Sequence, residues 1–92
     1  MLNKYLTRND ESIAYRMIDD EVIVVNLEKS NFHTFNAVGA FIWDRLDGKK
    51  SVKMIITDVA DEFDVDTATA EKDTIEFINS MLNEDLLIES SY

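Results

Sequence analysis

The sequence predicts an α+β fold in which a three-stranded antiparallel β-meander precedes three α-helices. The spacing of apolar residues changes from that of strands to that of helices at Asn36, and the first two helical segments begin at capping residues. A chain of 92 residues has room for one domain with a single core. Residues 1–11 are mostly polar and predict a flexible N-terminal lead-in, so the domain is expected over residues 12–92.

The meander is expected in the first third of the chain. A β-prone run over residues 13–18 ends at the turn signal Asp19-Asp20. Residues 21–27 form the clearest strand, because a continuous β-branched run is typical of a well-covered sheet position. A polar turn over residues 28–30 then leads into a third strand, Asn31–Phe35. We expect Phe35 to point into the core, which would place His33 inward or at its margin.

Two helical segments follow the meander. The first runs from an N-cap at Asn36 to a stop at Gly48, and the second follows an N-cap at Ser51. The apolar residues of the two segments recur at the spacing of one helix face: Val38, Phe41, Ile42 and Leu46, then Val52, Ile55, Ile56, Val59, Ala60 and Phe63. Trp43 lies at the rim of the first face and is expected to pack in the core.

The third helical segment begins at Asp66 or Thr67 and ends near Asn83 or Glu84. Its apolar residues form two lines about 100° apart, namely Ile75, Ile78 and Leu82, and Ala70, Thr74, Phe77 and Met81. This arc is wider than one core face requires, so the helix is either buried on two sides or exposes one edge to a groove. Residues 86–88 then form a short apolar end, either a strand or a packed tail.

The residue types offer no catalytic machinery. The chain has no cysteine and one histidine, His33, which has no evident acid–base partner. Its two glycines do not form a phosphate-binding loop, and Asp64 and Asp66 lack the glycine and glutamate of a calcium loop. We therefore expect a binding protein without an enzyme activity, a metal or a cofactor. The absence of cysteine, of a signal sequence and of a long apolar run favours the cytoplasm and no membrane contact.

The net charge of −10 is concentrated in the second half of the chain. Residues 1–53 hold eight acidic and eight basic residues, whereas residues 54–92 hold eleven acidic residues and one basic residue, Lys72. A meander with three helices also fits a winged helix-turn-helix, whose third helix would enter a DNA groove. That helix is acidic here, so phosphates would repel it, and nucleic acid is not the expected partner.

The stretch from Phe32 to Gly48 resembles the central signature of the PqqD-like family. It contains an aromatic strand end, a small-residue segment with Gly39, the pair Ile42-Trp43, a leucine three residues later and a closing Asp-Gly. The chain departs from the family pattern at Phe35, where leucine is commoner. The order of the helical segments and the terminal apolar residues also follow the family, so the resemblance covers about residues 12–89.

The resemblance implies a winged-helix-like RiPP recognition element. Members of this family bind the leader segment of a ribosomally made precursor peptide, which adds as a strand beside the third strand and contacts the last helix. They act as peptide chaperones for radical-SAM enzymes or other maturases, as in pyrroloquinoline quinone (PQQ) biosynthesis. The peptide-binding residues expected here are Asn31, Phe32, His33, Thr34, Lys72, Asp73, Ile75, Glu76, Phe77, Asn79 and Ser80.

The resemblance does not decide which flank of the third helix lines the groove. Lys72, Ile75 and Asn79 lie on one side of its apolar arc, and Asp73, Phe77, Ser80 and Met81 lie on the other. An acidic groove wall predicts a preference for a leader with Lys or Arg near the bound segment.

Four bases within nine positions form a separate cluster: Arg45, Lys49, Lys50 and Lys53. This basic cluster either contacts the partner enzyme or is a solvated turn between helices. Two alternatives to peptide binding also stay open, a winged-helix transcription regulator and a module that pairs with itself. The chain is accordingly expected as a monomer or a weak homodimer.

Overall fold

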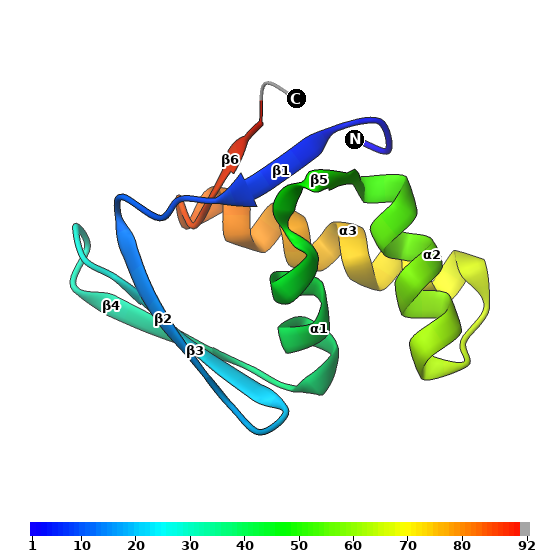
Figure 1. The fold of residues 1–92 in the computed structure, drawn as a ribbon, viewed down its shortest axis with the longest axis horizontal. Helices are drawn as coiled ribbons and strands as arrows, with labels where there is room; N and C mark the ends of the chain where they lie inside the picture. Colours follow the sequence, from blue (N-terminus) through cyan, green and yellow to red (C-terminus); the bar gives the residue numbers. More distant parts are fainter. Residues whose placement is uncertain (91–92) are drawn as a thin grey trace.

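The chain folds into two three-stranded sheets and three helices, and the computed structural model describes residues 1–90 (Figure 1). The first sheet is the predicted meander, with β2 (Ile13–Ile18), β3 (Glu21–Asn26) and β4 (Asn31–Phe35) in the order β2-β3-β4. Both neighbouring pairs are antiparallel. The α+β fold of a meander followed by three helices is therefore confirmed.

Side chains alternate across the meander as expected for a sheet with one covered face. Val22 and Val24 are fully buried, and Phe35, which pairs with Val22, is buried on the same face. The inward orientation of Phe35 is confirmed, and the half-buried His33 lies on that face opposite Val24. The other face of the sheet is open to solvent, with Phe32 69% exposed.

The second sheet joins three segments that are far apart in the sequence. It consists of β1 (Tyr5–Arg8), β5 (Asp47–Ser51) and β6 (Leu87–Glu89) in the order β5-β1-β6. The sequence predicted a flexible lead-in over residues 1–11, whereas β1 is the central strand of this sheet and buries Leu6. Residues 86–88 were predicted to form either a strand or a packed tail, and the structure shows a strand, β6.

Backbone and side-chain contacts hold β1 against the end of the first helix. The amide of Arg8 donates to the carbonyl of Leu46 at 3.2 Å, and its guanidinium donates to the carbonyl of Trp43 at 2.8 Å. Gly48 has φ +81° and lies buried inside β5. The helix therefore ends before Gly48, and not at it as the sequence suggested.

The three helices are α1 (Ala37–Arg45), α2 (Val52–Phe63) and α3 (Thr67–Asn83). Each begins after a side-chain N-cap. The side chain of Asn36 accepts from the amide of Gly39 at 3.1 Å, Ser51 accepts from Met54 at 3.2 Å, and Asp66 accepts from Thr69 at 2.7 Å. The N-caps predicted at Asn36 and Ser51 are confirmed, and the third helix starts within the predicted pair of positions.

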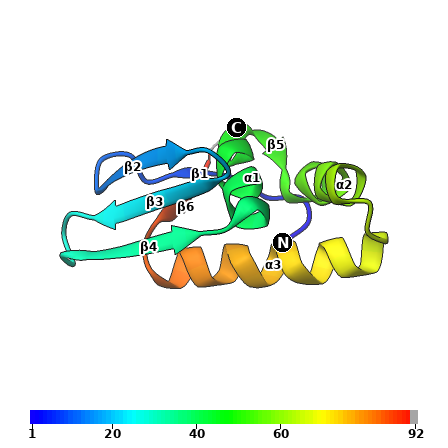
Figure 2. The ribbon, with the colours of Figure 1, turned by 90° about the horizontal axis from the view of Figure 1, so that it is seen from below.

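The core lies where the meander meets the helices. Trp43 is fully buried, in edge contact with Tyr15 at 5.5 Å between ring centroids and tilted against Phe35 at 5.8 Å. Figure 2 shows α3 running lengthwise past β4, α1 and α2, so that it covers one side of the molecule. The packing role predicted for Trp43 is confirmed, and it fixes α1 against the inner face of the meander.

Candidate functional site

A groove opens between β4, α1 and α3. It encloses a cavity of about 400 Å³. Its lining residues come from all three elements and from the cap between two of them: Thr34, Phe35, Asn36, Val38, Gly39, Ile42, Asp73 and Phe77. The hollow is mostly apolar with one carboxylate, which is the usual composition of a site that binds an apolar group and orients it with a few polar contacts.

Two aromatic rings and a glycine shape the floor of the groove. The rings of Phe35 and Phe77 meet edge to face with centroids 4.9 Å apart. A Cβ placed on Gly39 would lie 2.8 Å from the Cβ of Phe35 and 3.0 Å from Cε1 of Phe77. Only glycine lets α1 approach both rings this closely. Gly39 therefore sets the distance between the helix and the two walls.

The structure shows which flank of α3 faces the groove. Asp73 and Phe77 line the cavity, and Ser80 follows on the same helix face. Lys72 and Asn79 are exposed outside the cavity, as is Glu76. Ile75 is half-buried and lies about 160° around the helix from Phe77, so it packs against the core from the other flank. Of the two flanks considered from the sequence, the one with Phe77 lines the groove.

One side of β4 has no neighbouring strand in the part of the chain that the structure describes. The strand pairs only with β3, so its outer backbone groups are available for a further strand. Asn31, Phe32 and Thr34 are exposed along this edge, and Thr34 also lines the cavity. An open strand edge beside an apolar cavity is the arrangement by which sheets bind extended peptides.

Polar contacts join β4 and the β3–β4 turn to the C-terminal end of α3. Nε2 of His33 lies 3.8 Å from a carboxylate oxygen of Glu84, and its ring stacks on Phe35 at 6.5 Å. The buried side chain of Asn26 donates to the carbonyl of Glu84 at 3.0 Å, while its oxygen accepts from the amides of Glu28 and Lys29. These contacts tie the β3–β4 turn to the C-terminal end of α3, so β4 is held beside the helix.

The basic cluster predicted as an enzyme contact is only partly free. Arg45 and Lys50 share the carboxylate of Asp58, at 3.5 Å and 2.7 Å. Lys49 and Lys53 are exposed, and no acid of residues 1–90 is paired with either of them. The cluster is thus divided into a paired half, against α2, and an open half.

Two other site types find no support within residues 1–90. There is no group of three or more His, Asp or Glu side chains that could hold a metal ion. No helix in this range has the length and apolar character needed to cross a membrane.

The sequence did not identify the α1 wall of the groove. Asn36 was predicted as a cap, Val38 and Ile42 were assigned to a core face, and Gly39 was noted only in the small-residue segment, although all four line the cavity. The available signal was Gly39 itself, because a glycine inside a helical pattern is costly and marks a close approach.

Comparisons with known proteins agree with this geometry. A family model described as coenzyme PQQ synthesis protein D (PqqD) matches residues 21–87. A comparison with curated proteins finds no match. A solved structure described as TbiB1 in complex with the TbiA(beta) leader peptide is 29% identical with a TM-score of 0.80, over 94% of this chain and 96% of that one. A lasso peptide synthetase B1 complexed with the leader peptide has the same TM-score at 17% identity, over 91% of this chain and 98% of the other, and shares the fold.

Proposed function

Because the chain belongs to the family of coenzyme PQQ synthesis protein D, we propose that it binds the leader segment of a precursor peptide and presents it to a modifying enzyme. The observation that carries the proposal is the open edge of β4 beside the cavity of Phe35 and Phe77. The relative with 29% identity was solved with a leader peptide, over nearly the full length of both chains.

The leader would add as a fourth strand along β4. Hydrogen bonds from its backbone to the free edge supply affinity without regard to sequence, whereas its alternate side chains meet different surroundings and supply selectivity. One set faces the cavity between Phe35 and Phe77, and the other set lies beside the exposed Phe32. The bound peptide should therefore carry an apolar side chain that fits the cavity.

Backbone addition gives a direct test with a built-in control. In an added strand, every second backbone N–H points toward β4 and the others point to solvent. Two versions of one candidate leader are made, each with two N-methylated residues, and the second version is shifted by one position. One version should lose binding at least about tenfold while the other binds as the unmodified leader does. Equal binding by both versions would reject strand addition.

Chemical-shift mapping with the same leader locates the contact. The largest changes should fall on residues 31–35 and on the Asp73, Phe77 and Ser80 side of α3. Changes confined to Lys72, Ile75 and Asn79 would place the peptide on the opposite flank and contradict the groove.

We further propose that Lys49 and Lys53, the exposed half of the basic cluster, contact the modifying enzyme. Converting both to Glu should weaken the enzyme complex and leave leader affinity unchanged, since neither residue lines the groove. A Lys72→Glu variant is the charge-reversal control on α3, at an exposed position outside both the basic cluster and the cavity. If leader affinity falls while the enzyme complex persists, this assignment is wrong.

A further inference from the structure

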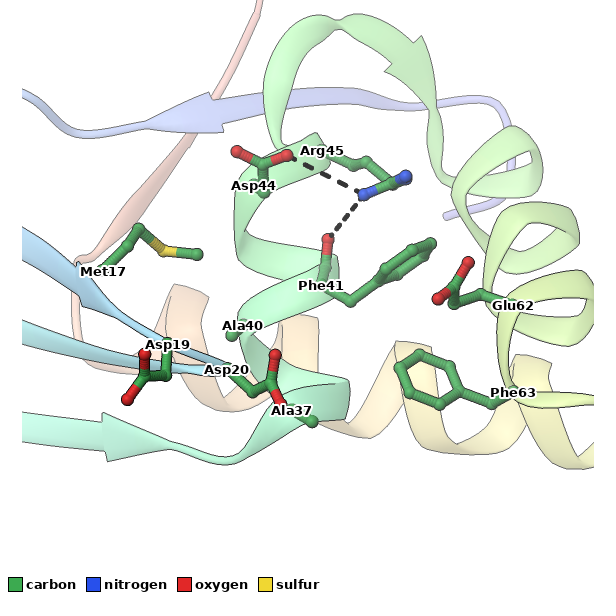
Figure 3. A pocket seen from close by; sticks show the side chains of 10 residues that line it. All are labelled: Met17, Asp19, Asp20, Ala37, Ala40, Phe41, Asp44, Arg45, Glu62 and Phe63. Atoms are coloured by element: carbon green, nitrogen blue, oxygen red, sulfur yellow. Dashed lines mark hydrogen bonds and ion pairs between the residues drawn. The ribbon is translucent and has the colours of Figure 1, made fainter.

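A second cavity, of about 430 Å³, lies between α1, the C-terminal end of α2 and the turn that joins β2 to β3 (Figure 3). The α1 residues that line it are Ala37, Ala40, Phe41, Asp44 and Arg45, whereas those that line the groove are Val38, Gly39 and Ile42. At 100° per residue these two sets are centred about 140° apart around the helix, and the two cavities share no lining residue. The second cavity is therefore separate from the groove.

Apolar side chains form one part of this cavity. The rings of Phe41 and Phe63 meet edge to face with centroids 5.3 Å apart, and both are only half-buried. Figure 3 shows both rings in the space between α1 and α2, and Met17 on the β2 side of α1. Met17 is 44% exposed. A flat or aliphatic group could thus pack here against the two partly exposed aromatic rings.

The rest of the lining is acidic. The lining includes four acids, Asp19, Asp20, Asp44 and Glu62, and one base, Arg45. Asp19, Asp20 and Glu62 have no ion pair with any of residues 1–90. The cavity therefore keeps a negative charge that the protein itself does not compensate.

Arg45 does not neutralise Asp19, Asp20 and Glu62, because its guanidinium already contacts other groups. Its guanidinium lies 3.5 Å from the centroid of the Phe41 ring, and its Nε is 3.5 Å from Asp58, which lies outside the cavity. Its Nη1 donates to the carbonyl of Phe41 and is 3.8 Å from Asp44. The arginine thus covers one side of the Phe41 ring and leaves the three unpaired carboxylates without a cation.

We propose that this cavity docks a cationic segment of the modifying enzyme, with a Lys or Arg side chain next to an apolar residue. A long basic side chain can lay its methylene groups on the Phe41 and Phe63 rings while its charge reaches the carboxylates. A bare metal ion fits less well, since no three acids of the described chain are close enough to hold one. The choice of the enzyme as the partner rests on the proposed function, whereas the ligand chemistry follows from the cavity.

The cavity can be tested with a defined probe. The probe is the capped peptide Leu-Arg-Phe-Lys-Leu-Ala, and its neutral twin has Gln at both basic positions. NMR titration should shift signals of Met17, Phe41 and Phe63 with the basic probe, and the neutral twin should bind about five- to tenfold more weakly. Shifts confined to the groove residues Thr34 and Phe77, or no binding of the basic probe, overturn the proposal.

Two double variants distinguish binding of the basic probe in the cavity from nonspecific attraction of the probe to an acidic protein. Asp20→Asn with Glu62→Gln removes two unpaired cavity charges and should weaken the probe about five- to tenfold. Glu71→Gln with Glu76→Gln makes the same change in net charge on the exposed side of α3 and should change affinity less than about twofold. Equal losses in the two double variants would show bulk electrostatics and overturn the proposal.

The leader titration is run on the same proteins so that the two proposals fail separately. If the cavity variant binds leader normally but loses the basic probe, both proposals stand. If no protein binds a leader while the probe behaves as expected, peptide presentation fails and the cavity chemistry stands. If the leader binds and the probe results show no cavity dependence, this inference fails alone.

Discussion

Gly39 shows how much of the groove depends on the absence of one methyl group. The caps at Asn36 and Ser51 follow from local rules, since a capping side chain meets an amide three residues later. The contact of Gly39 with Phe35 and Phe77 joins three elements instead. Its distances depend on how β4, α1 and α3 pack, so the sequence could indicate a special position but not its neighbours.

Gly39→Ala should destabilise the fold and weaken leader binding. The added Cβ would stand 2.8 Å from the Cβ of Phe35 and 3.0 Å from the Phe77 ring, and forced repacking of this kind costs about 1–3 kcal/mol. The gain in helix propensity offsets up to about 1 kcal/mol. Urea unfolding and leader titration measure the two effects. Adding Phe77→Leu should restore only part of the stability, because Phe35 remains; full stability in Gly39→Ala alone contradicts the contact.

Asp66 gives the start of α3 a dependence on pH. Hydrogen bonds from the Thr69 amide, and then from its hydroxyl, hold the pKa of Asp66 below its ordinary value of 3.8. A lowered folded-state pKa contributes stability above the unfolded pKa, and this contribution is lost as the pH falls through the folded pKa. Asp66→Asn should therefore be less stable than the parent at neutral pH, with the difference shrinking below pH 3.8. A difference that is constant over this range in urea titrations would reject the carboxylate's role.

At the scale of elements, the sequence predicted those whose pattern is local. The meander strands and all three helices have a continuous apolar period, and their bounds were predicted within a few residues, apart from the end of α1. β5 has the sequence Asp-Gly-Lys-Lys-Ser, without one apolar side chain, and β1 is only four residues long. Their strand form comes from backbone pairing with each other and β6, which no local pattern reveals.

Leu6 tests whether β1 belongs to the folded core. It is 2% exposed, so Leu6→Ala should lower the free energy of unfolding by about 2–5 kcal/mol. Leu2 lies outside β1 and is 37% exposed, so Leu2→Ala should change stability by less than about 0.5 kcal/mol. Chemical denaturation of both variants provides the comparison. If Leu6→Ala is as stable as Leu2→Ala, residues 1–11 are the loose lead-in that the sequence suggested.

The two flanks of α3 can be separated with a matched pair. Phe77 and Ile75 are both half-buried and both contact the core, so truncating either to Ala should destabilise the protein by about 1–3 kcal/mol. Of these two residues only Phe77 lines the groove, so only Phe77→Ala should lower the affinity for the leader, by about tenfold or more. Calorimetric titration under conditions where both variants are folded measures this difference. A similar loss in Ile75→Ala would mean that affinity follows stability and not the groove.

At the scale of the whole molecule, the two halves of the chain differ in charge and supply different walls of the groove. The first half is electrically neutral and supplies the open strand edge, whereas the acidic second half supplies α3. α3 carries the exposed acids Glu71, Asp73 and Glu76, which does not suit a helix that enters a DNA groove. The charge map was available from the sequence, but the placement of one acid in the groove and others around a second cavity needed the three-dimensional arrangement.

This charge arrangement predicts the kind of leader that binds. Asp73 lines the cavity and Glu84 lies beside His33 of β4, so a leader with Lys or Arg beside its bound segment should bind more tightly than an acidic one. Raising the salt concentration should weaken the basic leader, because screening reduces attraction between partly exposed charges. Asp73→Asn should reduce its affinity about two- to fivefold, while Glu71→Gln, an equal charge change outside the groove, should have less effect. Titrations of both variants at two salt concentrations measure these differences. Equal affinity for acidic and basic leaders, without salt dependence, would show that shape and backbone pairing alone select the peptide.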